Sequence, residues 1–183
     1  RRTMEDAHLY LQDFNNVPGQ GYFAIFDGHA GKFAAEWCRD NMNRILSEEL
    51  NVCPHMDVRE VMRNAFLKAD EQLEAESRSA GVRSGCTAVT SLIRLESDDS
   101  DQNKSRRRVL YTANVGDARS VLWYVDTSVC RLQLLTMNAS RGGKAIRLTY
   151  DHKGSDEFES KRITEKGGFL LNNRVNGACN LCV

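Results

Sequence analysis

The stretch FAIFDGHAGKFAAEWC, from Phe23 to Cys38, joins an apolar run to a helical pattern through an aspartate and a histidine. The run from Tyr22 to Phe26 is short, continuous and aromatic, which is typical of a buried strand. A charge at the exit of such a strand must be paired, solvated or bound to a metal ion. Asp27 and His29 stand at that exit, so this stretch locates a candidate site.

Periodicity outward from this stretch predicts strands and helices in separate layers, an α+β class, because the strands and helices do not alternate regularly. Trp37 lies on the apolar face of the first helix, and Asp57 is the expected N-cap of the second. Strands are predicted over His8–Phe14, Gly21–Asp27, Cys86–Leu95, Val109–Val115, Arg119–Tyr124, Ala145–Tyr150 and Phe169–Leu171, and helices over Gly31–Leu50, Asp57–Ser79 and Ser155–Lys166.

Composition limits the functional classes. A chain of 183 residues favours one domain, over residues 1–183, and Lys+Arg equals Asp+Glu at 25 each. No overall charge therefore points to nucleic acid or to a membrane surface. We find no signal peptide and no apolar run of membrane-spanning length, and the six cysteines are scattered. We expect a monomer in a reducing compartment, the cytoplasm or the nucleus, with a true N-terminus that lies before Arg1.

Two further patterns favour ordinary structural interpretations. The basic run Lys104–Arg108 suits a nucleic-acid contact, but it has no interleaved aromatic residues. We interpret the polar segment Ser97–Arg108 as a solvated hairpin loop. The pair Cys179 and Cys182 has the spacing of half a zinc site, but no second pair follows it, so we do not expect zinc there.

Acidic residues gather at three predicted strand ends, in Met4–Asp6, Phe26–His29 and Val115–Asp117. Hard divalent cations such as Mg²⁺ and Mn²⁺ prefer carboxylate and carbonyl oxygens. Gly28 allows a cation or phosphate to approach the backbone, and Asp27 and His29 share a side if the strand continues through it. Each segment alone is more often a turn or a surface feature. Their combination favours a metal site.

Six blocks follow one another in an order typical of one enzyme family. They are RRTMEDAH (Arg1–His8), FAIFDGHAG (Phe23–Gly31), SGCTA (Ser84–Ala88), ANVGDAR (Ala113–Arg119), LTYDHK (Leu148–Lys153) and RVNG (Arg174–Gly177). Together they resemble the metal-dependent serine/threonine protein phosphatases, the PPM or type 2C family, over nearly the whole chain. The resemblance implies a β-sandwich of two antiparallel sheets flanked by helices, the four-layer αββα arrangement of that family.

The resemblance also implies a chemistry, in which a centre of two Mg²⁺ or Mn²⁺ ions hydrolyses phosphoserine and phosphothreonine in proteins. Both cations would share Asp27 and hold a bridging water that attacks phosphorus. The carbonyl of Gly28, with Glu5 directly or through water, would complete the surroundings of the second cation. Asp6 would orient metal-bound water, and Asp117 matches a position for an additional, weaker metal.

Further roles follow from the same resemblance. Arg1 stands where the family places a phosphate-binding arginine, and His29 would protonate the leaving oxygen. Asp151 and His152 look like a metal pair, but in the family they belong to a structural turn before a helix. The expected partners are phosphoserine and phosphothreonine proteins, with kinases of a signalling cascade.

The chain departs from the family pattern in two places. Residues 124–141 look like an insertion where the family has a short hairpin, and residues 178–183 do not continue the family strand after RVNG. One hypothesis explains both: they are translated introns of the short fungal type, because the codons for Trp-Tyr-Val can contain a common fungal intron start. Transcripts that join Trp123 to the region of Gly142 would support it.

The same departures imply a C-terminally truncated domain, roughly the N-terminal two-thirds of the family fold. The family draws further aspartate ligands of the first metal from two later motifs, and neither occurs in this chain. We therefore expect weak stability, an uncovered apolar sheet face and little activity from the chain as written. The alternative function is an inactive fragment that binds a phosphoprotein or acts as a regulatory module.

Overall fold

The structure is a computed structural model that describes residues 3–97, 106–124, 144–171 and 174–175, with only the backbone given for Tyr124, Lys144, Arg174 and Val175. Its elements are β1 (Ala7–Gln12), the 3-10 helix η1 (Phe14–Asn16), β2 (Gly21–His29), α1 (Phe33–Val52), α2 (Val58–Ala80), β3 (Gly85–Ser97), β4 (Arg106–Val115), β5 (Val121–Tyr124), β6 (Lys144–Arg147), α3 (Glu157–Glu165), β7 (Leu170–Leu171) and β8 (Arg174–Val175).

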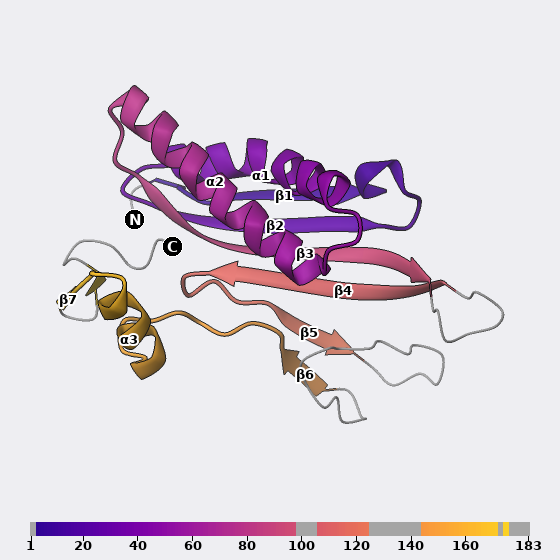
Figure 1. Cartoon of the computed structure of the whole chain (residues 1–183). Coiled ribbons are helices and arrows are strands. Elements are labelled where there is room, and N and C mark those ends of the chain that lie inside the picture. The colour runs from indigo at the N-terminus through magenta and orange to yellow at the C-terminus, as the bar shows by residue number, and fades with distance from the viewer. Residues whose placement is uncertain (1–2, 98–105, 125–143, 172–173, 176–183) are drawn as a thin grey trace.

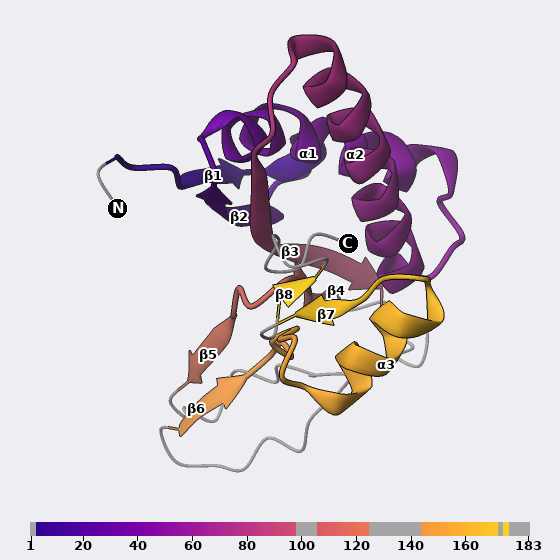
Figure 2. The ribbon, with the colours of Figure 1, turned by 90° about the vertical axis from the view of Figure 1, so that its left-hand side faces the viewer.

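The main sheet is antiparallel and has the strand order β1-β2-β3-β4 (Figure 1). Ala7 pairs with Phe26, and Asp27 pairs with Thr87. The other strands form two small sheets, β5-β6 and β7-β8. Both views place α1 and α2 on one side of the main sheet, and β5, β6 and α3 beyond β4, away from those helices (Figures 1 and 2). Antiparallel sheets flanked by helices confirm the predicted α+β class.

The core lies between α1, α2 and the main sheet. Along β2 the side chains alternate, so that Tyr22, Ala24 and Phe26 are buried while the residues between them face away from the helices. Trp37 is only 7% exposed, which confirms the predicted inner face of α1. The residues of α1 and α2 that complete this core are Ala35, Cys38, Met42, Ile45, Leu46, Val58, Val61, Met62, Ala65 and Ala69.

The opposite face of the main sheet carries exposed apolar side chains. Tyr10 and Ile25 are 59% and 56% exposed, and the rings of Tyr10 and Phe23 lie 5.0 Å apart between centroids. Large side chains on one sheet face are normally covered by a second layer. This face therefore shows the uncovered apolar surface that we expect from the sequence.

The first predicted strand, His8–Phe14, is too long by two residues. β1 ends at Gln12 because Asp13 adopts a left-handed conformation, with φ of 51°, and its carboxylate accepts a hydrogen bond of 2.7 Å from the amide of Gly19. Phe14 then begins η1 and inserts its ring into the core, next to Tyr22. Local hydrogen bonding of a short acidic side chain competes with strand pairing here.

The second correction concerns Ser97–Arg108, which we interpret from sequence as a loop. β3 continues to Ser97 and β4 begins at Arg106, so that Arg107 pairs with Glu96 across the ladder. Tyr111 also donates a hydrogen bond of 2.6 Å to Glu96. The pair Glu96–Arg107 therefore helps to extend the hairpin, as cross-strand pairs of opposite charge can. Residues 98–105 lie outside the described part.

Each helix begins and ends within two residues of its predicted bounds. Asp57 accepts a hydrogen bond from the amide of Arg59 at the start of α2, which confirms the predicted N-cap, and Gly81 ends the helix with φ of 66°. α1 begins at Phe33, two residues later than predicted, because Ala30 and Gly31 have φ of 57° and 119°. Left-handed residues cannot continue a helix.

Beyond the main sheet, β5, β6 and β7 are shorter than predicted, and β8 was not predicted. β5 begins at Val121 and β6 ends at Arg147, while the amide of Leu148 donates to the carbonyl of Ser120 just outside the ladder. The proposed insertion, 124–141, falls outside the described residues except for the backbone of Tyr124, which ends β5. Among the described residues, no helix has both the length and the apolar character needed to span a membrane.

Candidate metal centre

The acidic residues that the sequence singles out lie at one end of the main sheet, where its strands begin and end; we call this end the site edge. Strands β2 and β4 end at this edge and β1 and β3 begin there, because all four strands are antiparallel. Glu5 and Asp6 precede β1, whose first residue pairs with Phe26, so they lie beside the end of β2. Asp117 follows β4 at the same edge. The fold therefore brings together four segments that are far apart in sequence.

The end of β2 places Asp27 and His29 on one face. β2 continues to His29 in an extended conformation, with Gly28 opposite Cys86 and His29 opposite Gly85. Successive side chains of a strand alternate between faces, so Asp27 and His29 both point away from α1. This confirms the predicted common side. Asp27 is exposed and His29 is half-buried, so both are accessible to a ligand at this edge.

Gly28 forms a close contact that only glycine permits. It is buried, and a Cβ there would overlap the carbonyl oxygen of Glu5 and come within 3.2 Å of the Cβ of Ala35. The backbone of Glu5 thus lies in close contact with the end of β2. Backbone carbonyls and carboxylates of this kind are the donors that Mg²⁺ and Mn²⁺ prefer.

Thr87 is a candidate site residue that the sequence interpretation missed. It pairs directly with Asp27, and its hydroxyl oxygen is buried without a hydrogen-bond partner among the described residues. A buried hydroxyl normally has a partner, such as an ordered water or a ligand. The block SGCTA contains Thr87, but only the strand register reveals that it lies beside Asp27. An unsatisfied polar atom at this position fits a site that holds water or an ion.

The turn that carries Asp117 is held by neighbouring residues. Gly116 has φ of 78°, and its carbonyl accepts a hydrogen bond of 2.9 Å from the amide of His152. The side-chain amide of Asn114 donates to the carbonyl of Tyr150 at 2.7 Å. These contacts tie the segment after β6 to the end of β4 and fix the position of Asp117.

Asp151 is the central acid of a structural ion-pair cluster. It is 7% exposed and contacts Arg119 at 2.5 Å, Arg147 at 2.6 Å and Lys153 at 3.5 Å. The charge of this carboxylate is already balanced by three basic side chains, which disfavours its use as a metal ligand. The predicted structural role of Asp151 and His152 is therefore confirmed by their contacts.

The cluster also predicts a pH dependence. Hydrogen bonds from Arg119, with the positive charges of Arg119, Arg147 and Lys153, lower the pKa of Asp151 to about 2. The unfolded chain has the ordinary value near 3.8, so it binds more protons between these values and the stabilisation disappears as the pH falls from about 4 to about 2. We expect Asp151→Asn to lower the melting temperature by roughly 5 °C at pH 7 and by much less at pH 2.5. Melting curves at both pH values test this, and an equal loss at pH 2.5 would contradict it.

The described residues supply only part of a metal site. None of their histidine, cysteine, aspartate and glutamate side chains form a group of three that could hold an ion. The carboxylates at this edge are therefore hard oxygen donors that do not by themselves make a complete coordination sphere. They belong to Glu5, Asp6, Asp27 and Asp117. Arg1, Cys179 and Cys182 lie outside the described residues.

Comparison with known sequences identifies the family of this chain, and comparison with solved structures identifies its fold. The model of the family "Protein phosphatase 2C" matches residues 1–182. Protein phosphatase 2C homolog 1 of Saccharomyces cerevisiae is 41% identical over 182 residues, which are 97% of this chain and 58% of that protein. Protein phosphatase 2C homolog 1 of Schizosaccharomyces pombe is 40% identical over 177 residues, which are 97% of this chain and 44% of that protein.

Solved structures share the fold at lower identity. A serine-threonine phosphatase 2C from Toxoplasma gondii has a TM-score of 0.66 at 21% identity, with 96% of this chain and 55% of that chain covered. A Caenorhabditis elegans sex-determining protein has a TM-score of 0.70 at 23% identity, with 99% of this chain and 40% of that chain covered. The chain thus spans about half the length of the proteins that it matches. Because the family model matches nearly every residue, the chain belongs to the protein phosphatase 2C family.

Proposed function

We propose that the chain carries one part of a protein serine/threonine phosphatase centre that uses Mg²⁺ or Mn²⁺. The observation that supports this best is the contact between Glu5 and Gly28, which sets a backbone carbonyl and three carboxylates at one edge of the sheet. The unsatisfied hydroxyl of Thr87 lies beside them. Membership of the phosphatase family makes phosphoserine and phosphothreonine proteins the proposed substrates.

The proposed roles follow from the resemblance to the family, and for Asp27 and His29 they are supported by the common face of the two side chains. Bound divalent cations would supply a water that is nucleophilic at neutral pH. Asp27 would hold the cations, and Asp6 would orient water near them. His29 lies on the same face as Asp27 and donates a proton to the serine or threonine oxygen as the phosphorus–oxygen bond breaks. Arg1 is the proposed phosphate ligand, through the two donors of its guanidinium fork.

A second candidate function is a fragment that binds phosphoproteins without turnover. Two observations favour it. No three acidic or histidine side chains converge among the described residues, and an octahedral cation normally needs several protein oxygens or waters. The chain also covers only 58% of the S. cerevisiae relative, so part of a complete centre can come from sequence that is not in this chain.

Hydrolysis of para-nitrophenyl phosphate distinguishes the two functions. We would compare this chain with a chimaera in which the S. cerevisiae relative supplies the sequence that follows the RVNG block. With Mn²⁺ we expect turnover by the chimaera, loss of it on chelation, and turnover by this chain that is lower by at least about 100-fold. Turnover by the unextended chain that Asp27→Asn removes would reject the inactive-fragment function.

Substrate class can be tested with the same pair of proteins. We expect the chimaera to release phosphate from phosphoserine and phosphothreonine peptides, and not from phosphotyrosine peptides of matched sequence. A chimaera that folds cooperatively, as judged by a sharp thermal transition, and still hydrolyses none of these substrates would contradict the proposed function. Kinases of a signalling cascade remain the proposed source of its substrates.

A further inference from the structure

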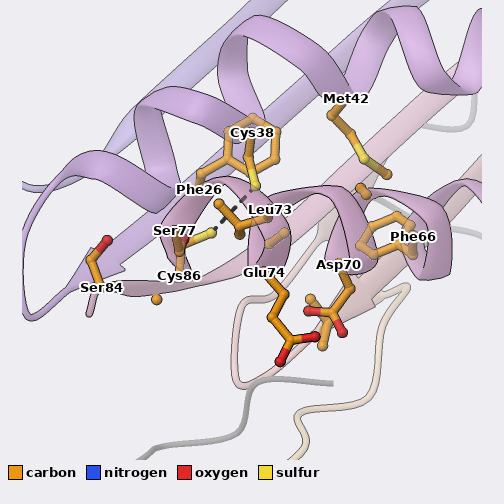
Figure 3. A pocket seen from close by; sticks show the side chains of 14 residues that line it. Phe26, Cys38, Met42, Phe66, Asp70, Leu73, Glu74, Ser77, Ser84 and Cys86 are labelled. Atoms are coloured by element: carbon orange, nitrogen blue, oxygen red, sulfur yellow. Dashed lines mark hydrogen bonds between the residues drawn. The ribbon is translucent and has the colours of Figure 1, made fainter. Parts of the chain in front are cut away.

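Two cysteines from different elements meet behind the candidate centre. Cys38 is on α1 and Cys86 is on β3, 48 residues later, and their sulfur atoms lie 3.7 Å apart, with the thiol of Cys86 donating to Cys38 (Figure 3). Figure 3 shows both side chains pointing toward each other across the gap between helix and sheet. A disulfide bond is about 2.05 Å long, so the sulfurs must approach by roughly 1.7 Å to form one.

A cavity gives small molecules access to both sulfurs. It has a volume of about 230 Å³ and lies between α1, α2 and the sheet, and both cysteines line it. Its wall is mostly apolar, with Met42 and Phe66 among its residues, and Asp70 and Glu74 of α2 contribute carboxylates (Figure 3). A space of this volume admits a molecule the size of hydrogen peroxide. Both thiols therefore line a space that can hold the oxidant.

The pair differs from the other described cysteine. Cys38 and Cys86 contact each other, whereas Cys53 stands at the C-terminal end of α1, is half-buried and does not line this cavity. Cys130, Cys179 and Cys182 lie outside the described residues. Cys53 is thus a matched reference thiol on the same helix.

We propose that Cys38 and Cys86 form an oxidisable dithiol that peroxide converts to an intramolecular disulfide. One thiol transfers oxygen from the peroxide, which gives a sulfenic acid and one water. The second thiol attacks the sulfenic sulfur, so that the sulfur–sulfur bond forms and a second water leaves. Two thiols thereby supply the two electrons that reduce one peroxide to two waters.

The disulfide would tie α1 to the sheet at a functional position. Cys86 pairs with Gly28 in the ladder, and its neighbour Thr87 pairs with Asp27. A cross-link over 48 residues also restricts the unfolded chain. We therefore expect the oxidised chain to melt at least about 5 °C higher than the reduced chain. This inference concerns the fold behind the site and does not depend on phosphatase activity.

The test uses the full chain with serine at the four other cysteine positions, Cys53, Cys130, Cys179 and Cys182. After peroxide treatment and alkylation of the remaining thiols, mass spectrometry of the peptides measures linkage. We expect the peptides that contain Cys38 and Cys86 to be joined within one chain, and the melting temperature to rise. A further Cys86→Ser change should abolish both effects and leave Cys38 as a sulfenic or sulfinic acid.

The unmodified chain provides a second measurement that does not depend on the serine variant folding. We expect peptide mapping of the unmodified chain, after the same treatment, to detect the disulfide between Cys38 and Cys86 before any disulfide that contains Cys53. Thiols of Cys38 and Cys86 that stay fully alkylatable would overturn the proposal. So would linkage only between chains, or joining of Cys53 at an equal rate.

Discussion

Asp27→Asn should lower phosphatase turnover of the chimaera by a factor on the order of 10³, the largest functional effect that we expect from one substitution in this chain. Asparagine keeps the size of the side chain and removes its charge. Asp27 lies two residues before the end of β2 and its side chain is exposed, so we expect the substitution to disturb the packing of the fold little. The loss should therefore fall on cation binding and turnover rather than on folding.

The control for this variant is Asp40→Asn. Asp40 is an exposed aspartate on α1 that pairs only with the neighbouring Arg39 in the described contacts, and we expect its substitution to change turnover less than twofold. Isothermal titration with Mn²⁺ supplies a readout separate from activity. We expect Asp27→Asn to weaken Mn²⁺ binding and to leave the melting temperature in chelator within about 2 °C of the parent. Full activity of the Asp27 variant would contradict its role as the shared ligand.

Much of the fold could be predicted because its signals are local. The alternation from Tyr22 to Phe26 identified β2, and the spacing of Trp37, Met42 and Ile45 identified the buried face of α1. The capping aspartate of α2 fixed its start. Each of these features depends on residues within a few positions of one another, which is the range over which sequence patterns are informative.

The errors arise where a distant or specific contact decides the structure. Asp13 ends β1 through a hydrogen bond to Gly19, and propensity alone did not indicate that left-handed turn. The hairpin around residue 97 extends further than its polarity suggests, because Glu96 and Arg107 face each other across two strands. In both places a side-chain interaction overrides the average behaviour of polar residues.

In the candidate site, too, local features could be predicted from the sequence, and features that depend on distant contacts could not. Asp27 and His29 could be assigned to one face from their spacing, since a strand alternates with a period of two. The position of Thr87 beside Asp27 depends on strand register, which pairs residues 60 positions apart. The approach of Glu5 to Gly28 likewise depends on the pairing of β1 with β2. Sequence patterns name the chemically capable residues, and the register decides which of them meet.

Gly28→Ala should destabilise the chain by about 3 kcal/mol, the largest stability effect that we expect from adding one methyl group. The new Cβ would overlap the carbonyl oxygen of Glu5 and crowd the Cβ of Ala35. Both obstacles belong to packed elements, namely the backbone that leads into β1 and the first turn of α1. Neither can rotate away as a flexible side chain would, so the end of β2 must shift.

Gly21→Ala is the matched control, because Gly21 begins the same strand. Its Cβ would meet mainly the ring of Phe23, at 3.0 Å, and that ring is partly exposed and free to turn toward solvent. We expect a cost below about 1 kcal/mol, measured by denaturant unfolding of both variants in chelator. A large loss at Gly28 alone would mean that folding holds the backbone of Glu5 against the end of β2 without any cation. Equal losses of stability in the two variants would mean that the contact between Glu5 and Gly28 is loosely packed in the folded chain. Metal binding would then have to order this edge of the sheet.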